Sequence, residues 1–126
     1  MHYSKLKISK DATSRLRSLK QKTHLTPNLL CRFALMRSLE DGPLGDIPLP
    51  DQDGQEFNAY TLTGELTELL FALVRTVEED SSREPLPFEE LLARVRGHIH
   101  RGVGMLAVRV RSPADLLQLT QARQSG

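Results

Sequence analysis

The sequence predicts a mainly α-helical single domain of about five helices, preceded by a short N-terminal strand or arm. Apolar residues, mostly leucine, recur every three or four positions along most of the chain, which is the spacing of one helix face. Trp is absent and aromatic residues reach only 5%, so the core must come from Leu, Val, Ile and Ala. The 126 residues are enough for one domain with its own core, which we place at 1–126.

The first element is predicted at residues 4–9, where polar and apolar residues alternate. In an extended conformation Lys5, Lys7 and Ser9 share one face, and the apolar side chains between them share the other. A lone strand is not stable, so we expect a partner strand, for which another subunit is one source.

Two helices follow the strand. Ser9 is expected to cap the first, which runs to about Thr23. Thr26-Pro27 predicts the start of the second, because it places an N-cap residue before a proline at the first helical position. The second helix should run to about Glu40, where Asp-Gly-Pro ends it. Residues 4–41 thus form a basic strand–helix–helix module, which is ribbon-helix-helix-like.

Residues 42–62 are expected to be a loop, because they hold three of the seven prolines and several aspartates. Such a long loop is expected to wrap the surface or cover a subunit contact. Residues 63–126 form the helical remainder. Thr63 should cap the third helix, whose C-terminal end carries the acidic run 78–80, expected to be a solvated terminus.

The fourth helix is predicted from its apolar residues between 91 and 99. Gly102 and Gly104 interrupt its rhythm, and residues 106–110 also alternate as a strand does, so helix and strand both stay open there. Ser112-Pro113 predicts the start of a last helix, which runs to about Arg123.

Charge is strongly segregated along the chain. Nine of the first 37 residues are Lys or Arg and only Asp11 is acidic, whereas residues 38–90 hold fourteen acidic and two basic residues. A segregated cationic surface is typical of proteins that bind polyanions, because neutralising phosphates releases condensed counterions. With few aromatic rings available for base stacking, duplex DNA is favoured over single strands. The predicted DNA-contacting residues are Lys5, Lys7, Lys10, Arg15, Arg17, Lys20, Lys22 and Arg32.

The front half resembles a known family in three stretches. These are Leu-Lys-Ile-Ser-Lys-Asp-Ala at 6–12, Leu-x-x-Leu-Lys-x-Lys-Thr at 16–23 and Leu-Thr-Pro-Asn-x-Leu-Cys-Arg at 25–32. They look like the N-terminal half of the DndE family of bacterial DNA sulfur-modification systems, in which sulfur replaces a backbone phosphate oxygen. The resemblance covers about residues 5–41, and 54–58 and 100–102 extend it.

The resemblance implies a helical protein that self-associates as a dimer or tetramer and binds duplex DNA, preferably nicked, through its basic surface. It also implies partner proteins of the same sulfur-modification system, namely a desulfurase, an iron–sulfur protein and an ATPase. Carried over by position, the family's cationic surface falls on Lys5, Lys7, Lys10, Arg17, Lys20 and Lys22.

Other residues that could carry chemistry have simpler interpretations. Cys31, the single cysteine, invites a sulfur-carrier hypothesis, but its apolar neighbours favour a buried packing role. His98 and His100 would point apart on a helix, so we expect no shared metal ion and place them, with Arg94, Arg96 and Arg101, on a second basic surface. The aspartates at 51 and 53 fit a turn better than a calcium loop.

No set of nucleophile, base and orienting residue stands out, so we expect neither an enzyme nor a cofactor. One cysteine excludes an internal disulfide, and no apolar run approaches the length needed to span a bilayer. The N-terminus has no signal-peptide pattern, so we expect a cytoplasmic protein.

The sequence therefore favours a non-enzymatic DNA-binding subunit of a DNA backbone sulfur-modification (phosphorothioation) system. Two alternatives stay open. A ribbon-helix-helix transcriptional repressor would read bases with Lys5, Lys7 and Ser9. A protein-only adaptor would use the acidic residues of the segment 38–90 to bind a basic partner.

Overall fold

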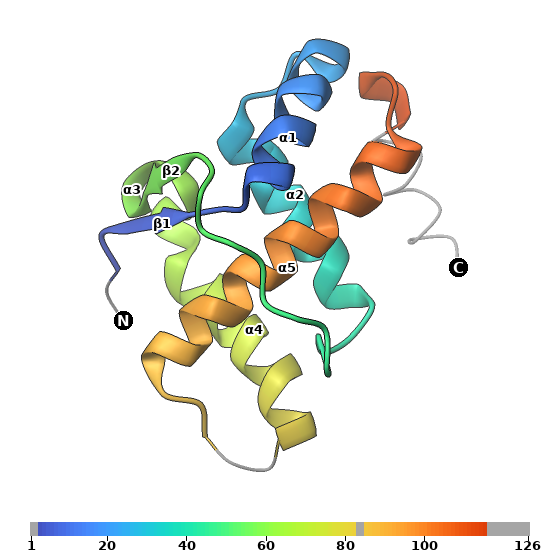
Figure 1. Ribbon diagram of the computed structural model, residues 1–126. Helices are drawn as coiled ribbons and strands as arrows, with labels where there is room; N and C mark the ends of the chain where they lie inside the picture. The colour runs from blue at the N-terminus through green and yellow to red at the C-terminus, as the bar shows by residue number, and fades with distance from the viewer. Residues whose placement is uncertain (1–2, 83–84, 116–126) are drawn as a thin grey trace.

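The chain folds into packed helices with one short sheet at the edge (Figure 1). The computed structural model describes residues 3–82 and 85–115. In chain order the elements are β1 (Lys5–Lys7), α1 (Lys10–Thr23), α2 (Pro27–Glu40), β2 (Glu56–Asn58), α3 (Ala59–Leu62), the 3-10 turn η1 (Gly64–Leu66), α4 (Thr67–Ser82) and α5 (Phe88–Arg109). The predicted mainly helical class and the strand–helix–helix order at the front are confirmed.

Helix α5 is the longest element, with 22 residues, and it runs through the centre of the molecule (Figure 1). Helices α1, α2 and α4 all pack against it, α2 most extensively. At Gly102 the two helices approach so closely that a Cβ atom would overlap the carbonyl oxygen of Ala34. Gly102 therefore permits the α2–α5 contact, and α5 continues through both glycines to Arg109. This settles the ambiguity at 106–110: the helix includes Val108, and only Val110 is extended.

The N-terminal strand finds its partner within the same chain. β1 pairs antiparallel with β2, so that Leu6 lies opposite Phe57. Both side chains enter the core, with 2% and 6% exposure. The prediction of a loop throughout residues 42–62 is therefore wrong from Glu56 onward, where a strand and the short helix α3 occur. The part of the loop before β2 crosses α5 and wraps the surface, as expected (Figure 1).

The ends of α1 and α2 match the sequence signals. The Ser9 Oγ accepts a hydrogen bond from the Ala12 amide at 3.0 Å and caps α1. His24, with a φ of 63°, ends α1 in the left-handed region. Pro27 occupies the first turn of α2, although Thr26 makes no side-chain capping hydrogen bond. Here local side-chain chemistry determines where the helices begin and end.

The third predicted helix begins later than expected. Residues 64–66 form a 3-10 turn and α4 starts at Thr67, while Thr63 is buried and bonded to the hydroxyl of Tyr3 at 2.6 Å. Leu66 and Leu69, whose spacing with the later apolar residues predicts a buried helix face, are 42% and 55% exposed. Most of the last predicted helix lies outside the described residues. Its first residues, 113–115, are described and are helical. No helix in the described part of the chain is long and apolar enough to cross a membrane.

Candidate nucleic-acid interface

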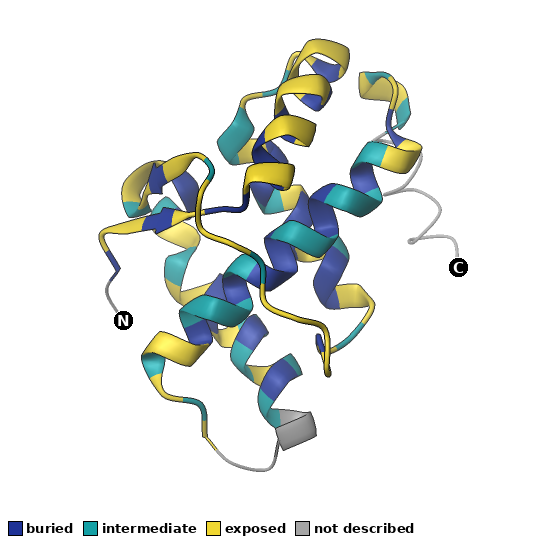
Figure 2. Ribbon diagram, in the orientation of Figure 1, coloured by how far each residue is buried: buried dark blue, intermediate teal, exposed yellow. Residues whose placement is uncertain are grey.

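Helix α1 presents a cationic outer face. Its buried side, which includes Ala12, Leu16 and Leu19, packs inward, whereas the outward side is exposed along its whole length (Figure 2). The exposed side carries all five cations of the helix: Lys10, Arg15, Arg17, Lys20 and Lys22. The same amphipathic pattern that buries α1 against α5 therefore turns all five charges to the solvent, with Lys10 and Arg17 seven positions apart on one flank.

Two of the predicted DNA-contacting cations have a carboxylate partner. Lys5 lies 3.6 Å from Glu56 across the β1–β2 pair, and Arg15 lies 2.9 Å from Asp11 one turn earlier in α1. Both pairs are largely exposed, so the partners compete only weakly for the cation. Five others form no ion pair with any described residue: Lys7, Lys10, Arg17, Lys20 and Lys22.

Arg32 belongs to a different environment. Its guanidinium donates to the carbonyl oxygens of Leu62 at 2.6 Å and Thr61 at 3.2 Å, which are the last residues of α3. Asn28 also donates to the Thr61 carbonyl, at 3.1 Å. Arg32 thus satisfies the C-terminal carbonyls of a short helix, and two of its five N–H donors are already engaged there.

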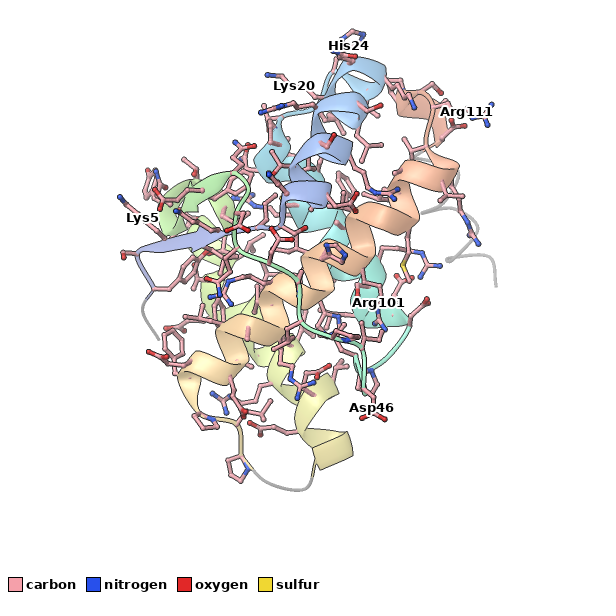
Figure 3. All side chains as sticks on the ribbon, in the orientation of Figure 1. Lys5, Lys20, His24, Asp46, Arg101 and Arg111 are labelled. Carbon is pink, nitrogen blue, oxygen red and sulfur yellow. The ribbon has the colours of Figure 1, made fainter. Side chains whose placement is uncertain are left out.

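Basic residues of α1 and of the chain after α5 lie near each other in space. Lys20, His24 and Arg111 lie near one end, formed by α1 and the C-terminal part of α5, and Asp46 lies at the opposite end (Figure 3). Arg109 and Arg111 are exposed there and form no ion pair within the described residues. The sequence-based prediction did not include these two arginines, although the basic C-terminal third of the chain was a usable signal.

Ser9 does not lie on an exposed strand face. It is 1% exposed, and its Oγ, besides capping α1, lies 2.7 Å from Nδ1 of His100 on α5. The prediction that Ser9 faces the DNA groove with Lys5 and Lys7 is therefore wrong. The physical reason is that the chain turns from β1 into α1 at Ser9, and capping uses its hydroxyl inside the protein.

A buried polar network joins α2, α4 and α5. Nδ1 of His98 lies 2.8 Å from Oγ of Ser38, and Nε2 lies 2.9 Å from Oε2 of Glu78. Glu78 also accepts from the Leu44 amide at 3.0 Å and from Arg94 at 3.1 Å. At 2% exposure Glu78 contradicts the prediction of a solvated acidic terminus, because the run turns its first carboxylate toward His98.

This serine–histidine–glutamate set superficially resembles a hydrolytic triad. Ser38 and His98 are both 0% exposed, and the Ser38 Oγ already accepts from Nε of Arg101 at 2.8 Å. Burial lowers the pKa of His98 below 6.5, against the opposing effect of its hydrogen bond to Glu78. The buried, neutral imidazole links α5 to α2 and α4. The arrangement is therefore explained as a structural contact between helices, with no route for a substrate.

The second predicted basic surface does not form as expected. Arg101 donates to the carbonyls of Ser38 and Gly42, both at 2.6 Å, and so satisfies the end of α2. Arg94 pairs with Glu78, and Arg96 is only half-exposed. His98 and His100 point to different partners, as expected for positions two apart on a helix. Arg94 and Arg101 are bonded within the fold because α5 is central, not peripheral.

Cys31 is buried in the core at 1% exposure, as predicted. Burial raises the pKa of its thiol to about 12. A thiol that stays protonated at neutral pH is a poor nucleophile, so the geometry opposes a sulfur-carrier role.

The aspartates of the wrapping loop form a turn, as predicted. Oδ2 of Asp51 accepts from the amides of Lys10 at 3.0 Å and Asp53 at 3.1 Å. The hydrogen bond from the Lys10 amide is the largest cause that lowers the pKa of Asp51. Across the described residues no group of three or more His, Cys, Asp or Glu is placed to hold a metal ion.

The fold and this surface define a class: small, mainly helical proteins that present one cationic helix on the outside of a helical core. The family model described as DNA sulphur modification protein DndE matches residues 5–113, and the chain belongs to this DndE family. A search of curated proteins found no match.

Two solved structures share the fold. The crystal structure of DndE from Escherichia coli B7A, described as involved in DNA phosphorothioation modification, is 22% identical. It has a TM-score of 0.68 over 82% of this chain and 97% of that one. A DndE mutant described as involved in DNA phosphorothioation is 21% identical, with a TM-score of 0.68 over 84% and 99% of the two chains. At this identity the likeness establishes the fold alone.

Proposed function

We propose that this protein is a non-enzymatic DNA-binding subunit of a DNA phosphorothioation system, acting in the cytoplasm. It binds duplex DNA, preferably nicked, through the phosphates, and works with the other sulfur-modification proteins of that system. Membership of the DndE family supports a role in DNA phosphorothioation, and the cationic surface of α1 supports binding through the phosphates.

One observation carries the proposal. Lys10, Arg17, Lys20 and Lys22 share the exposed side of one helix and have no carboxylate partner among the described residues. Cations that are already paired inside the protein release few counterions on binding, whereas unpaired ones gain the full effect. Such a surface favours contact with phosphates over base reading, so binding should depend little on sequence.

The repressor alternative has less support. A ribbon-helix-helix protein needs β1 to pair with its counterpart in a second subunit, but β1 pairs with β2 of its own chain. Ser9, the third residue of the expected reading face, is buried. Base-specific recognition by this strand is therefore not part of the proposal.

Self-association is part of the proposal and has its own support. Leu29, Phe33 and Met36 recur at spacings of four and three on α2 and are 37%, 44% and 43% exposed. Side chains at these spacings share one helix face. An exposed apolar face of this kind is typical of subunit contacts. A dimer or tetramer would join several cationic helices on one duplex and multiply a modest affinity.

The test replaces Lys7, Arg17 and Lys20 together by glutamine and titrates nicked and intact duplexes of the same sequence. We expect much weaker binding and a slope of log K against log salt that is smaller by about 2 to 3, because each lost phosphate contact removes about 0.9. A control variant with Leu69→Glu, Ala72→Glu and Thr76→Glu changes the net charge equally at exposed positions on α4, away from α1.

The outcomes separate the alternatives. Equal weakening in both variants would mean that only net charge matters, and the α1 surface would lose its role. Unchanged affinity in the α1 variant would remove these cations from the interface, and no binding by the unmodified protein would favour the protein-only adaptor. Equal affinity for nicked and intact duplexes would remove the nick preference and leave phosphate binding in place.

A further inference from the structure

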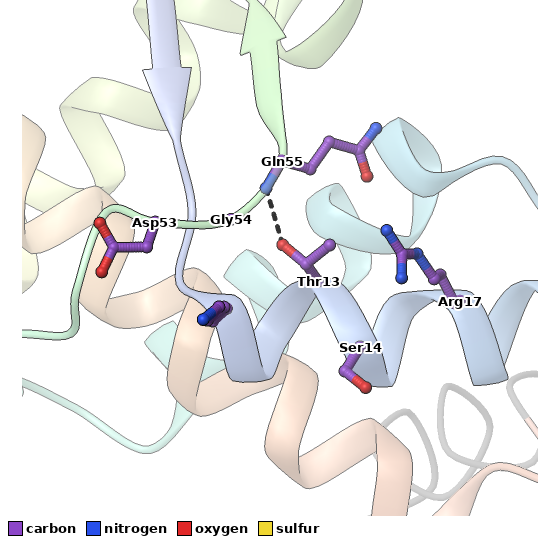
Figure 4. Close-up of a pocket in the computed structure, with 7 residues that line it drawn as sticks. Thr13, Ser14, Arg17, Asp53, Gly54 and Gln55 are labelled. Carbon is purple, nitrogen blue, oxygen red and sulfur yellow. Dashed lines mark hydrogen bonds between the residues drawn. The ribbon is translucent and has the colours of Figure 1, made fainter.

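A cleft lies on the flank of α1 beside the segment that leads into β2. It measures about 540 Å³, and one wall is formed by Lys10, Ser14 and Arg17, the other by residues 53–55 (Figure 4). The three α1 residues lie four and three positions apart and therefore share one helix face. Lys10 and Arg17 are about 10 Å apart along the helix axis, from the rise per residue.

The second wall is held in a fixed position. The Gln55 amide donates to Oγ1 of Thr13 at 2.8 Å, and the Gly54 amide donates to the carbonyl of Ile8 at 2.9 Å. A Cβ atom at Gly54 would overlap Oγ1 of Thr13 and the Ser9 carbonyl, so only glycine allows this close approach. The width of the cleft is thus set by backbone contacts and not by mobile side chains.

The groups that face the cleft are mostly free donors. The side chains of Lys10, Ser14, Arg17 and Gln55 are exposed and make no hydrogen bond to another described residue. Figure 4 shows the Gln55 side-chain amide and the Arg17 guanidinium toward the same end of the cleft, with the Asp53 carboxylate toward the other end, beyond Gly54. Thr13 is not available, because its hydroxyl donates to the Ser9 carbonyl at 2.8 Å.

The start of α1 itself is not the site. Asp51 accepts from the Lys10 amide and Ser9 accepts from the Ala12 amide, so two of the free amides at the start of the helix are satisfied within the protein. An anion is therefore directed to the flank, which two cations and two neutral donors line. Asp53 disfavours an anion at the far end and places it toward Arg17 and Gln55.

We propose that this cleft binds the backbone of a DNA strand, with Arg17 and Lys10 supplying charge and with Gln55 and Ser14 supplying neutral hydrogen bonds to its phosphodiester groups. The inference rests on the proposed function. It adds Gln55 and Ser14, which the charge pattern does not reveal, to the DNA-contacting residues. Planar and hydroxyl donors beside a guanidinium suit the tetrahedral oxygens of a phosphate.

The test uses two single variants, each with a matched control. Gln55→Ala is paired with Gln52→Ala in the same loop, and Ser14→Ala with Ser18→Ala on the same helix; both control residues are exposed and do not line the cleft. Gln55→Ala keeps the backbone bond to Thr13. Binding of the full chain to a labelled duplex is measured by anisotropy at several salt concentrations, and circular dichroism confirms folding.

We expect Gln55→Ala and Ser14→Ala each to weaken binding about fivefold at every salt concentration, with an unchanged salt slope, because a neutral donor releases no counterion. Arg17→Ala should instead reduce the slope by about 1. The controls should stay within twofold of the unmodified protein.

Two results would contradict the proposal that the cleft binds the DNA backbone. One is wild-type affinity in both Gln55→Ala and Ser14→Ala while Arg17→Ala weakens binding, which would leave the proposed function intact. The other is equal weakening in a variant and its control. If the unmodified protein does not bind duplex at all, the proposed function fails first, and the cleft proposal fails with it.

Discussion

Arg17 and Arg32 have the same side chain in very different surroundings. Arg17 projects from the exposed side of α1, whereas Arg32 bonds to the carbonyls of Thr61 and Leu62 at the end of α3. A guanidinium that already satisfies helix-end carbonyls must give up those hydrogen bonds before it can bind a phosphate. Sequence alone does not distinguish the two, because both are single cations within the same basic segment.

The two arginines should therefore respond oppositely to replacement by glutamine. We expect Arg32→Gln to lower the free energy of unfolding by about 1 kcal/mol, since the part-buried Leu62 carbonyl loses its charged donor, and to leave the salt slope of DNA binding unchanged. Arg17→Gln should barely change stability but reduce that slope by about 1. Urea denaturation and salt-dependent anisotropy measure the two effects, and a reduced slope in Arg32→Gln would return Arg32 to the interface.

At the scale of whole elements, local signals predicted α1 and α2 well and long-range contacts decided the rest. Ser9 marks the start of α1 through its capping hydroxyl, and Pro27 marks the start of α2 through its fixed φ. The three-residue strand β2 has no such signal, because it is defined by pairing with β1 about fifty positions away. Glu78 was misassigned for the same reason: its partner His98 lies on another helix.

The close α2–α5 contact depends on Gly102, which has no side chain. A Cβ atom at Gly102 would overlap the backbone of Ala34, whereas one at Gly104 would have nothing within 4 Å. We expect Gly102→Ala to lower the free energy of unfolding by about 1 to 3 kcal/mol, the usual range for overpacking. The matched control Gly104→Ala should raise it by up to about 1 kcal/mol, because alanine favours the helix. Urea denaturation measures both, and equal effects would contradict the close approach.

The network that joins α2, α4 and α5 predicts a pH dependence. The pKa of His98 lies below 6.5 in the native protein, mainly because of burial, with Arg101 and Arg94 acting in the same direction and Glu78 opposing them. As pH falls below 6.5 the unfolded chain binds a proton at this residue before the native one does. The free energy of unfolding should therefore be constant at higher pH and fall from about this point toward the native pKa.

The His98 prediction can be checked directly. An NMR titration of the imidazole resonances gives the native pKa without a variant, and a midpoint at or above 6.5 would contradict the prediction. Urea denaturation between pH 7.5 and 5.5 gives the stability change, which cannot exceed about 1.4 kcal/mol per pH unit for one group. His98→Gln, if folded, should show a smaller dependence over the same range.

At the scale of the whole molecule the net charge of +1 hides a polar arrangement. The cationic helix α1 and the exposed arginines near the end of α5 lie at one end, away from Asp46 (Figure 3). A protein with so small a net charge gains little from non-specific attraction at a distance. Its affinity for DNA should therefore come from the few unpaired cations that touch phosphates.

This arrangement fixes the expected salt dependence. Five unpaired cations at the front of the chain, Lys7, Lys10, Arg17, Lys20 and Lys22, correspond to a slope of log K against log salt of about −4 to −5 per subunit. Raising salt from about 50 to 200 mM should then weaken binding by about 10² to 10³. Anisotropy titrations with one duplex and with a second of unrelated sequence measure the slope and its sequence dependence together. A loss below tenfold, or a strong preference between the two duplexes, would show that contacts other than phosphate neutralisation dominate, because counterion release is steep in salt and indifferent to base sequence.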